Sequence, residues 1–276
     1  TGLVVNVPCP SQVDESLFVI SADYWHDTRL ELKRRLGDQI FVLGQPSSSG
    51  DQSPHLIYEG AAEERMLRLK GRTQRQDIAA RIATAAEDVL SCIAPTASGD
   101  LPLAHMLRTV ELPMRRLTPE EVQEALQEAE QCRLQFEAEK AKLAANPELR
   151  KQPRWYVPVT AAYRRMRWLM AVKERYERQQ HNPFVPVEIH AVRVGDAAFA
   201  TNPFELYLDF GVYIKARSPA VHTFLVQLCG QGGYVPSARS VAGGGYGSVP
   251  ASNVVGPEGG RKLADETIAM LLELWQ

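Results

Sequence analysis

The sequence predicts an α/β protein with a mixed, largely parallel sheet flanked by helices and with an inserted antiparallel helical hairpin. Three observations predict this class. The apolar run Leu3–Val7 is followed by a helical segment and a second apolar run, and a strand–helix–strand order favours parallel pairing. Residues 115–182 show the spacing of two long amphipathic helices. Val185–Val194 alternates apolar and polar residues, as a half-buried strand does.

Length and composition fit a globular domain. The chain has 276 residues, of which 45% are hydrophobic and 23% are charged. Its net charge of −2 gives no general attraction for nucleic acid, so we expect no nucleic-acid partner. No apolar run approaches the roughly 20 residues that span a bilayer, so we expect no transmembrane segment. The four cysteines are scattered and contain no CxxC pair, which argues against a zinc ribbon, a thioredoxin-like motif or a disulfide framework.

The N-terminus begins at Thr1, directly before an expected strand, without a Met or a targeting signal. A chain that opens in this way predicts a fragment. We therefore expect residues 1–276 to form a single α/β domain that lacks its N-terminal part. The sequence leaves the oligomeric state and the cellular compartment open.

Capping residues and breakers place the elements in order. Ser21-Ala22-Asp23 offers an N-cap for a helix that runs to Leu36, where Gly37 is a stop signal. Gly71 predicts a break in a second helical stretch. We expect further strands at Gln39–Leu43, Leu103–Pro113, Ala197–Thr201 and Val221–Cys229, and helices at Tyr58–Leu90 and Arg261–Trp275.

The hairpin at residues 115–182 begins with a strong helix start. Thr118 is a capping residue, Pro119 fits the first helical position, and Glu121 closes a capping box. The first helix runs to Asn146 and the second covers about Thr160–Gln180. Such a hairpin can be a brace, a lid or a dimerisation arm, and the sequence does not choose among them.

Two loops carry the residues with chemical potential. Gly44–His55 follows an expected strand and contains Asp51, Ser53 and His55, which are either ligand-binding groups or local caps. Gly230–Gly260 holds ten of the 19 glycines and includes Tyr234 and Tyr246, so its backbone can approach a ligand closely.

Five short motifs in this order resemble the catalytic domain of the neutral/alkaline (non-lysosomal) ceramidases. Gly50–His55 is similar to their GDxSPN motif, and residues 192–205, which end in Asn202-Pro203-Phe204-Glu205, resemble their RIG…PGEF segment. Tyr234 in GGYV and Tyr246 in GGGYGS match the two tyrosines of the family, with the same separation. Residues 7–11 and 21–23 stand where the family has AVHPTS and SSD. The hairpin at 115–182 is not part of the resemblance.

The resemblance implies a zinc site. In that family three histidines, a glutamate and a tyrosine hold one zinc ion, so Glu205 and Tyr234 would be metal ligands. Cys9 would stand in place of one histidine, and a thiolate is a good zinc ligand. The other two histidines form an HxH motif, which we expect N-terminal to this chain, so the zinc site is incomplete here. We also expect Glu205 in the first turn of a helix that extends to Ala216.

The implied activity is hydrolysis of the amide bond of a small-molecule or lipid-like N-acyl substrate by metal-activated water. Tyr246 would stabilise the oxyanion, and Ser53 would bind the carbonyl side of the substrate. Asp51, His55 and Gly233 would contact the substrate, although His55 replaces the family's asparagine. Two alternatives stay open: a ligand-binding relative that has lost the metal, and a serine hydrolase that uses Ser53.

Overall fold

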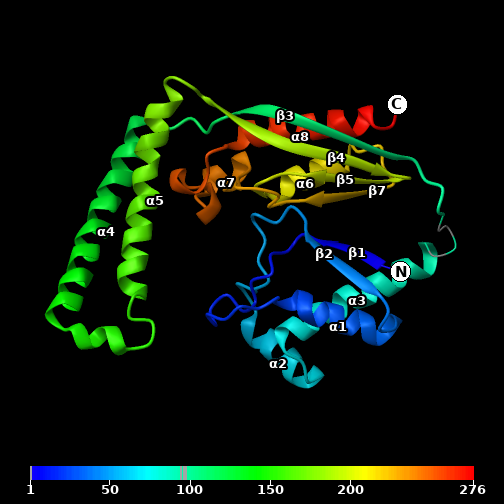
Figure 1. Ribbon diagram of the computed structural model, residues 1–276, viewed down its shortest axis with the longest axis horizontal. Helices are drawn as coiled ribbons and strands as arrows, with labels where there is room; N and C mark the ends of the chain where they lie inside the picture. Colours follow the sequence, from blue (N-terminus) through cyan, green and yellow to red (C-terminus); the bar gives the residue numbers. More distant parts are fainter. Residues whose placement is uncertain (1, 94, 96–97) are drawn as a thin grey trace. The chain divides into compact units, whose positions relative to one another are not determined.

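The computed structural model, which describes residues 2–93, 95 and 98–276, confirms the mixed α/β class (Figure 1). The chain divides into two compact units. The first unit contains Thr1–Thr109, Glu188–Gly232 and Ala264–Gln276. The second contains Val110–Val187 and Gly233–Leu263. This division leaves the single domain a prediction.

The first unit begins with the predicted strand–helix–strand. Strands β1 (Gly2–Val7) and β2 (Phe41–Pro46) are parallel and are joined by α1 (Tyr24–Leu36). The Asp23 side chain caps α1 by accepting a hydrogen bond from the Tyr24 main-chain nitrogen, as the sequence predicts. The centre of this part is apolar because Leu32 of α1 and Val42 of β2 pack with Ala83 from the third helix.

Two helices follow β2, and they are separated where the sequence predicts a break. Helix α2 (Gly60–Lys70) ends at Gly71, which adopts a φ of 62° that favours glycine. Helix α3 (Gln74–Ile93) then packs against α1. Arg35 of α1 ties the two together by donating hydrogen bonds to Thr84 (2.9 Å) and Glu87 (2.6 Å) of α3.

A four-stranded sheet has the order β3 (Leu103–Pro113), β4 (Phe184–Val194), β5 (Ala197–Thr201) and β7 (His222–Val226). Strands β4 and β5 are antiparallel, and β5 pairs with β7 in parallel. The C-terminal half of α8 (Pro257–Glu273) contacts this sheet in the first unit. Arg108 of β3 donates to Glu273 (2.7 Å) and Glu266 (3.1 Å), and the Arg193 guanidinium lies 4.4 Å from the centre of the Trp275 ring system.

One expected helix start is wrong. Glu205 lies in the short strand β6 (Glu205–Leu206), and α6 (Leu208–Lys215) begins after Tyr207, whose extended backbone precedes it. The reason is that both main-chain polar groups of Leu206 bond outside a helix, to Gln227 and Gly50.

The second unit is built around the predicted hairpin of α4 (Pro119–Ala145) and α5 (Val157–Gln179), connected through the 3-10 helix η2 (Pro147–Lys151). Thr118 and Glu121 form the predicted capping box. The two helices share a core that contains Ala125, Ala129, Cys132, Leu169 and Val172.

The glycine-rich stretch of the second unit is more ordered than the long loop that its composition suggests. It contains β8 (Tyr234–Val235), α7 (Ala238–Gly243), η3 (Tyr246–Ser248) and η4 (Pro250–Ser252). Ser237 caps α7 by accepting from the Ser240 main-chain nitrogen. Among the described residues, no helix has the length and hydropathy needed to cross a bilayer.

Candidate functional site

The carboxyl ends of three strands meet in the first unit. The Ser47 nitrogen, just after β2, donates to the Val7 carbonyl of β1 (2.9 Å), and the Gln227 nitrogen, just after β7, donates to the Pro46 carbonyl (3.2 Å). The Asn6 amide also donates to the Leu225 carbonyl (2.8 Å). Ligands of open α/β sheets bind outside such strand ends. The loops that leave these strands are therefore the place to look for a site.

Gln227 joins the loop after β2, residues 47–51, to the segment after β5, residues 202–208, and we call these two segments the strand-end loops. Its side-chain oxygen accepts from the main-chain nitrogens of Ser49 (3.2 Å) and Leu206 (3.1 Å). Its side-chain nitrogen donates to the Ser49 hydroxyl (2.9 Å). Gln227 is only 4% exposed, so these bonds are protected from water.

Gly50 and Asp51, from the GDxSPN-like motif, hold the segment that contains Glu205. The Gly50 nitrogen donates to the Leu206 carbonyl (2.9 Å), and a Cβ on Gly50 would collide with the Glu205 carbonyl. One carboxylate oxygen of Asp51 accepts from the Leu208 nitrogen (2.8 Å) at the start of α6. The structure thus brings the Gly50–Asp51 and Glu205 motifs together. Asp51 already uses one oxygen to anchor the loop, and its predicted substrate contact stays a prediction.

Cys9 follows β1 and is half-buried. The Tyr24 hydroxyl donates to the Cys9 carbonyl (2.6 Å), which holds the turn after the strand. Burial, with the nearby Asp23 carboxylate, raises the pKa of the Cys9 thiol. The thiolate is the form that binds metals, so this environment disfavours the ligand form of Cys9 when no metal is bound.

Ser53 and His55 do not form a nucleophile–base pair. The Ser53 hydroxyl accepts from the main-chain nitrogen of His55 (3.1 Å). The Nε2 atom of the His55 ring lies 2.8 Å from the Gln12 carbonyl and 3.4 Å from the Glu15 carboxylate. A carbonyl can only accept, so Nε2 carries a proton there. This arrangement resembles a local turn and does not favour the serine-hydrolase alternative.

The residues present do not by themselves build a zinc site. Within residues 2–93, 95 and 98–276, no group of three or more His, Cys, Asp or Glu side chains lies close enough to hold a metal ion. A catalytic zinc ion takes three protein ligands and a water. Zinc binding through Cys9, Glu205 and Tyr234 therefore stays a prediction from the resemblance.

The second unit places the two predicted tyrosines in one aromatic cluster. The rings of Tyr234 and Tyr246 lie 5.7 Å apart in an edge-to-face arrangement, and Trp168 of α5 stacks 6.4 Å from Tyr246. Tyr246 is 72% exposed, so its hydroxyl is accessible. Gly233 allows a close approach of the main chain, because a Cβ there would lie 2.7 Å from the Ser252 carbonyl. Its contact with substrate stays a prediction.

Two arginines hold residues 246–253, which we call the tyrosine loop. Arg175 of α5 donates to the Pro250 and Asn253 carbonyls, and Arg115 donates to the Ser248 carbonyl and to the Asn253 side chain. Burial, with the nearby positive charge of Arg115, lowers the pKa of Arg175 to about 10. Arg175 is still a cation at neutral pH, because a pKa of about 10 lies well above 7, and the loop is held by two guanidinium groups.

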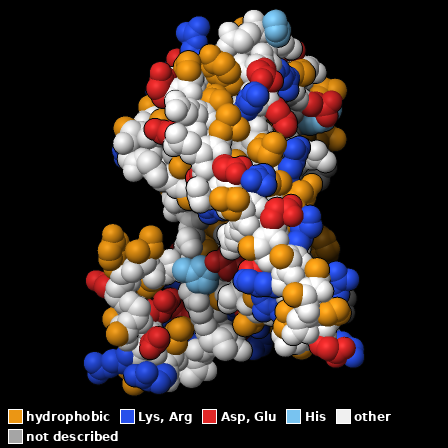
Figure 2. Space-filling model, turned by 90° about the vertical axis from the view of Figure 1, so that its left-hand side faces the viewer, with side chains coloured by type: hydrophobic (Ala, Val, Ile, Leu, Met, Phe, Trp, Pro, Cys, Tyr) orange, Lys and Arg blue, Asp and Glu red, His pale blue; other side chains and the backbone are white. Residues whose placement is uncertain are grey.

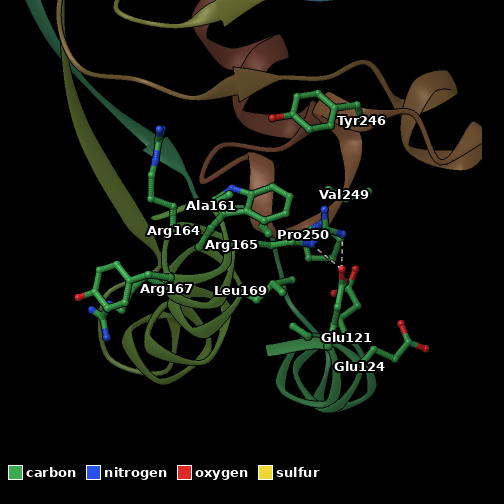
Figure 3. Close-up of a pocket in the computed structure, with 15 residues that line it drawn as sticks. Glu121, Glu124, Ala161, Arg164, Arg165, Arg167, Leu169, Tyr246, Val249 and Pro250 are labelled. Atoms are coloured by element: carbon green, nitrogen blue, oxygen red, sulfur yellow. Dashed lines mark hydrogen bonds and ion pairs between the residues drawn. The ribbon is translucent and has the colours of Figure 1, made fainter. Parts of the chain in front are cut away.

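A groove of about 960 Å³ lies between the hairpin and the tyrosine loop (Figure 3). Its volume is at the upper end of the range of ligand sites, roughly 300–1,000 Å³. It has an apolar floor and a charged rim. The apolar members are Ala125, Ala161, Tyr163, Trp168, Leu169, Tyr246, Val249, Pro250 and Ala251, and the charged ones are Glu121, Glu124, Glu128, Arg164, Arg165 and Arg167.

One face of the molecule carries charges of both signs. On the face shown in Figure 2, basic and acidic side chains are interspersed with hydrophobic ones. An electrostatic footprint for nucleic acid is instead a basic patch or stripe.

Sequence reasoning missed three side chains that organise these regions: Gln227, Arg115 and Arg175. Each has a local signal that is weak. Gln227 is a polar residue in the apolar run Val221–Cys229, and Arg175 is one of five arginines between 164 and 178. Their partners lie far away along the chain, so their roles need the fold.

Comparison with descriptions of protein families and with curated proteins finds no match. Solved structures do match. A neutral ceramidase from Pseudomonas aeruginosa aligns with a TM-score of 0.58 and 14% identity, over 99% of this chain and 44% of that one. A structure described as a ceramidase complexed with C2 gives 0.57 and 13%, over 99% and 45%. The chain therefore has a ceramidase-like fold and spans less than half the length of these proteins.

Proposed function

We propose that this protein is a hydrolase that cleaves the amide bond of a small-molecule or lipid-like N-acyl substrate. The observation that carries the proposal is the alignment of 99% of the chain with two solved ceramidases. The order of the GDxSPN-like, Asn202–Glu205, GGYV and GGGYGS motifs supports it independently. At 14% identity the structural likeness alone shows a fold, so the activity is inferred from the fold and the motifs together.

The reaction adds water across the amide bond. The oxygen of water forms a bond to the acyl carbon, the carbon–nitrogen bond breaks, and the products are a carboxylate and a protonated amine. In the transition state the acyl oxygen gains negative charge. The exposed Tyr246 hydroxyl is suited to donate a hydrogen bond to that oxygen, because its loop is held in place by Arg115 and Arg175.

The strand-end loops give Glu205 a fixed backbone. Gly50, Asp51 and Gln227 hold the main chain directly after it, at Leu206 and Leu208, and a functional carboxylate needs such a rigid support. Ser53 and His55 stay candidates for contacts with the carbonyl side of the substrate.

Zinc is a separate part of the proposal. It is carried by the resemblance through Cys9, Glu205 and Tyr234, and elemental analysis of the purified protein tests it directly. Zinc that co-purifies with the wild type and is lost in Glu205→Gln would support it. If the metal-free protein hydrolyses amides at full rate, the zinc proposal is wrong and the proposed hydrolase activity stands.

The activity is tested by following amine release from N-lauroyl amides with and without a chelator. Tyr246→Phe should lower kcat by roughly 10²–10³, the typical loss for one oxyanion donor. Ser53→Ala separates the alternatives, because total loss of a chelator-insensitive activity would indicate a serine hydrolase. Binding of an N-acyl amide without turnover would indicate a non-catalytic relative and would overturn the proposed function.

A further inference from the structure

The groove of the second unit is formed in part by the hairpin, which contains none of the motifs that carry the sequence resemblance. The hairpin of α4 and α5 supplies one wall, and the tyrosine loop supplies the other. We propose that this groove binds the acyl chain of the substrate, with Arg164 at the end where the carboxylate forms. The proposal rests on the proposed function, since it gives that activity its substrate class.

The two walls of the groove are joined to each other. Ala251 packs against the hairpin core, and Arg175 of α5 donates to the Pro250 and Asn253 carbonyls. The Ser252 hydroxyl donates to the Tyr246 carbonyl (2.7 Å). A groove between parts that are joined in this way keeps its shape without a ligand, which reduces the entropic cost of binding.

The floor of the groove suits an apolar chain. Trp168 is partly buried against the hairpin core and stacks toward Tyr246, with Val249 and Pro250 beside them. These side chains offer aromatic and aliphatic surface but few hydrogen-bonding groups. A flexible hydrocarbon chain gains affinity from such a surface through the hydrophobic effect alone.

Two charged side chains of the rim, Arg164 and Glu124, have no ion-pair partner within the described part of the chain. Arg165 pairs with Glu128, and Arg167 lies 3.6 Å from Glu174, whereas Arg164 has no ion-pair partner there. Figure 3 shows the Arg164 side chain extending away from α5 toward the level of the Tyr246 ring, and the Tyr246 hydroxyl points to the same side. A cation and a hydroxyl donor that face one space complement a carboxylate.

The occupant that fits both features is a linear acyl chain with a carbonyl or carboxylate end. Hydrolysis turns the amide carbonyl into a carboxylate, so the end next to Arg164 gains charge during the reaction. Arg164 then recognises the acid product, and the apolar wall recognises chain length. We therefore infer that the hairpin is a specificity element for long-chain N-acyl amides.

The experiment measures binding of laurate to the purified protein by isothermal titration calorimetry, with dodecanol as a matched neutral probe. Trp168→Ala should weaken both probes about tenfold, because buried aromatic side chains are common binding anchors. Arg164→Gln should weaken laurate about tenfold and leave dodecanol unchanged. Arg164 is exposed, so this variant is expected to fold normally.

Matched controls lie on the same hairpin outside the groove. Trp155→Ala and Arg133→Gln should bind both probes as the wild type does. Far-UV circular dichroism checks that Trp168→Ala is folded. Wild-type protein without saturable laurate binding, or equal laurate affinity in the wild type and Arg164→Gln, would overturn the proposal.

Kinetics separate this inference from the activity on which it rests. If N-lauroyl amides are hydrolysed but Trp168→Ala and Arg164→Gln keep the wild-type dependence of KM on chain length, the groove assignment fails and the hydrolase stands. If laurate binding depends on Trp168 and Arg164 but no amide is hydrolysed, the proposed function fails and the acyl-chain site stands.

Discussion

The strand-end loops of the first unit and the tyrosine loop of the second unit are irregular segments that must be held still, and they are held by different chemistry. Neutral groups hold the strand-end loops, where Gln227 contacts Ser49 and Leu206. Charged groups hold the tyrosine loop, where Arg115 and Arg175 donate to main-chain carbonyls. The two arrangements differ in the free energy that it costs to bury the groups that hold the loop.

The difference follows from which backbone groups need a partner. The strand-end loops present two nitrogens and a hydroxyl close together, and one amide side chain both accepts and donates. The tyrosine loop presents several carbonyls, which need donors, and a guanidinium has five of them in a rigid fork. Burying a charge costs more than burying an amide. The lowered pKa of Arg175, to about 10, is the sign of that cost.

The largest effect is expected in the neutral network. Gln227→Leu removes the partner of two buried nitrogens and of the Ser49 hydroxyl, and each buried group left unpaired costs about 1–3 kcal/mol. We expect about 3 kcal/mol less stability in urea unfolding. Hydrogen exchange should accelerate at residues 47–51 and 205–208.

The matched control is Gln39→Leu, since Gln39 is exposed in the same unit and should change stability by less than about 0.5 kcal/mol. If hydrogen exchange in the strand-end loops is unchanged in Gln227→Leu, the loops are held by other contacts. The contrast between a neutral and a charged network is then wrong.

A smaller effect is expected at the charged clamp. Arg175→Met leaves the Pro250 and Asn253 carbonyls without their donors, but it also removes the cost of a buried charge. We expect about 2 kcal/mol less stability, with faster exchange confined to residues 247–254. The stability of Arg175→Lys should lie between that of the wild type and that of Arg175→Met, since lysine keeps the charge and loses the forked donor geometry.

Arg178→Met, three residues along the same helix at an exposed position, is the control and should change stability by less than about 0.5 kcal/mol. Equal effects at 175 and 178 would mean that the carbonyls of the tyrosine loop find other partners. In that case both regions would rest on neutral contacts.

The elements that sequence predicts correctly are those whose determinants are local. The capping box of Thr118 and Glu121 and the helix break at Gly71 depend on residues within one turn. The start of α6 is wrong because Leu206 bonds to Gln227, 21 residues away, and to Gly50. At Leu206, hydrogen bonds to residues distant in the sequence determine the backbone conformation, and the local preference for helix does not.

For the candidate site, motif order predicts which segments form it, and the structure shows contact between two of these segments. Gly50 and Asp51 contact the Glu205 segment directly, as neighbouring motifs of one site should. The residues that position them are invisible to sequence patterns, because Ser49 and Gln227 are 178 residues apart and Arg175 and Pro250 are 75 apart. Contacts between residues that lie so far apart along the chain leave no periodic pattern in the sequence.

The smallest effect concerns two cysteines that report on the two regions separately. Cys9 is half-buried at the strand ends, and Cys132 is buried in the hairpin core. Burial raises the pKa of the Cys9 thiol, so the folded state holds this proton more tightly than the unfolded state does. The resulting stability is complete below the unfolded pKa, near 9, and is lost as pH rises through the higher folded pKa.

At pH 8 we expect iodoacetamide to label exposed Cys92 first and Cys9 more slowly, because the thiolate is the reactive form. Cys132 should react only when the hairpin opens. Mass spectrometry of labelled peptides gives the three rates. Arg175→Met should accelerate Cys132 and leave Cys9 unchanged, and Gln227→Leu should do the reverse. Acceleration of both cysteines by either variant would show that the two networks are one, since a local clamp cannot loosen a region that it does not hold.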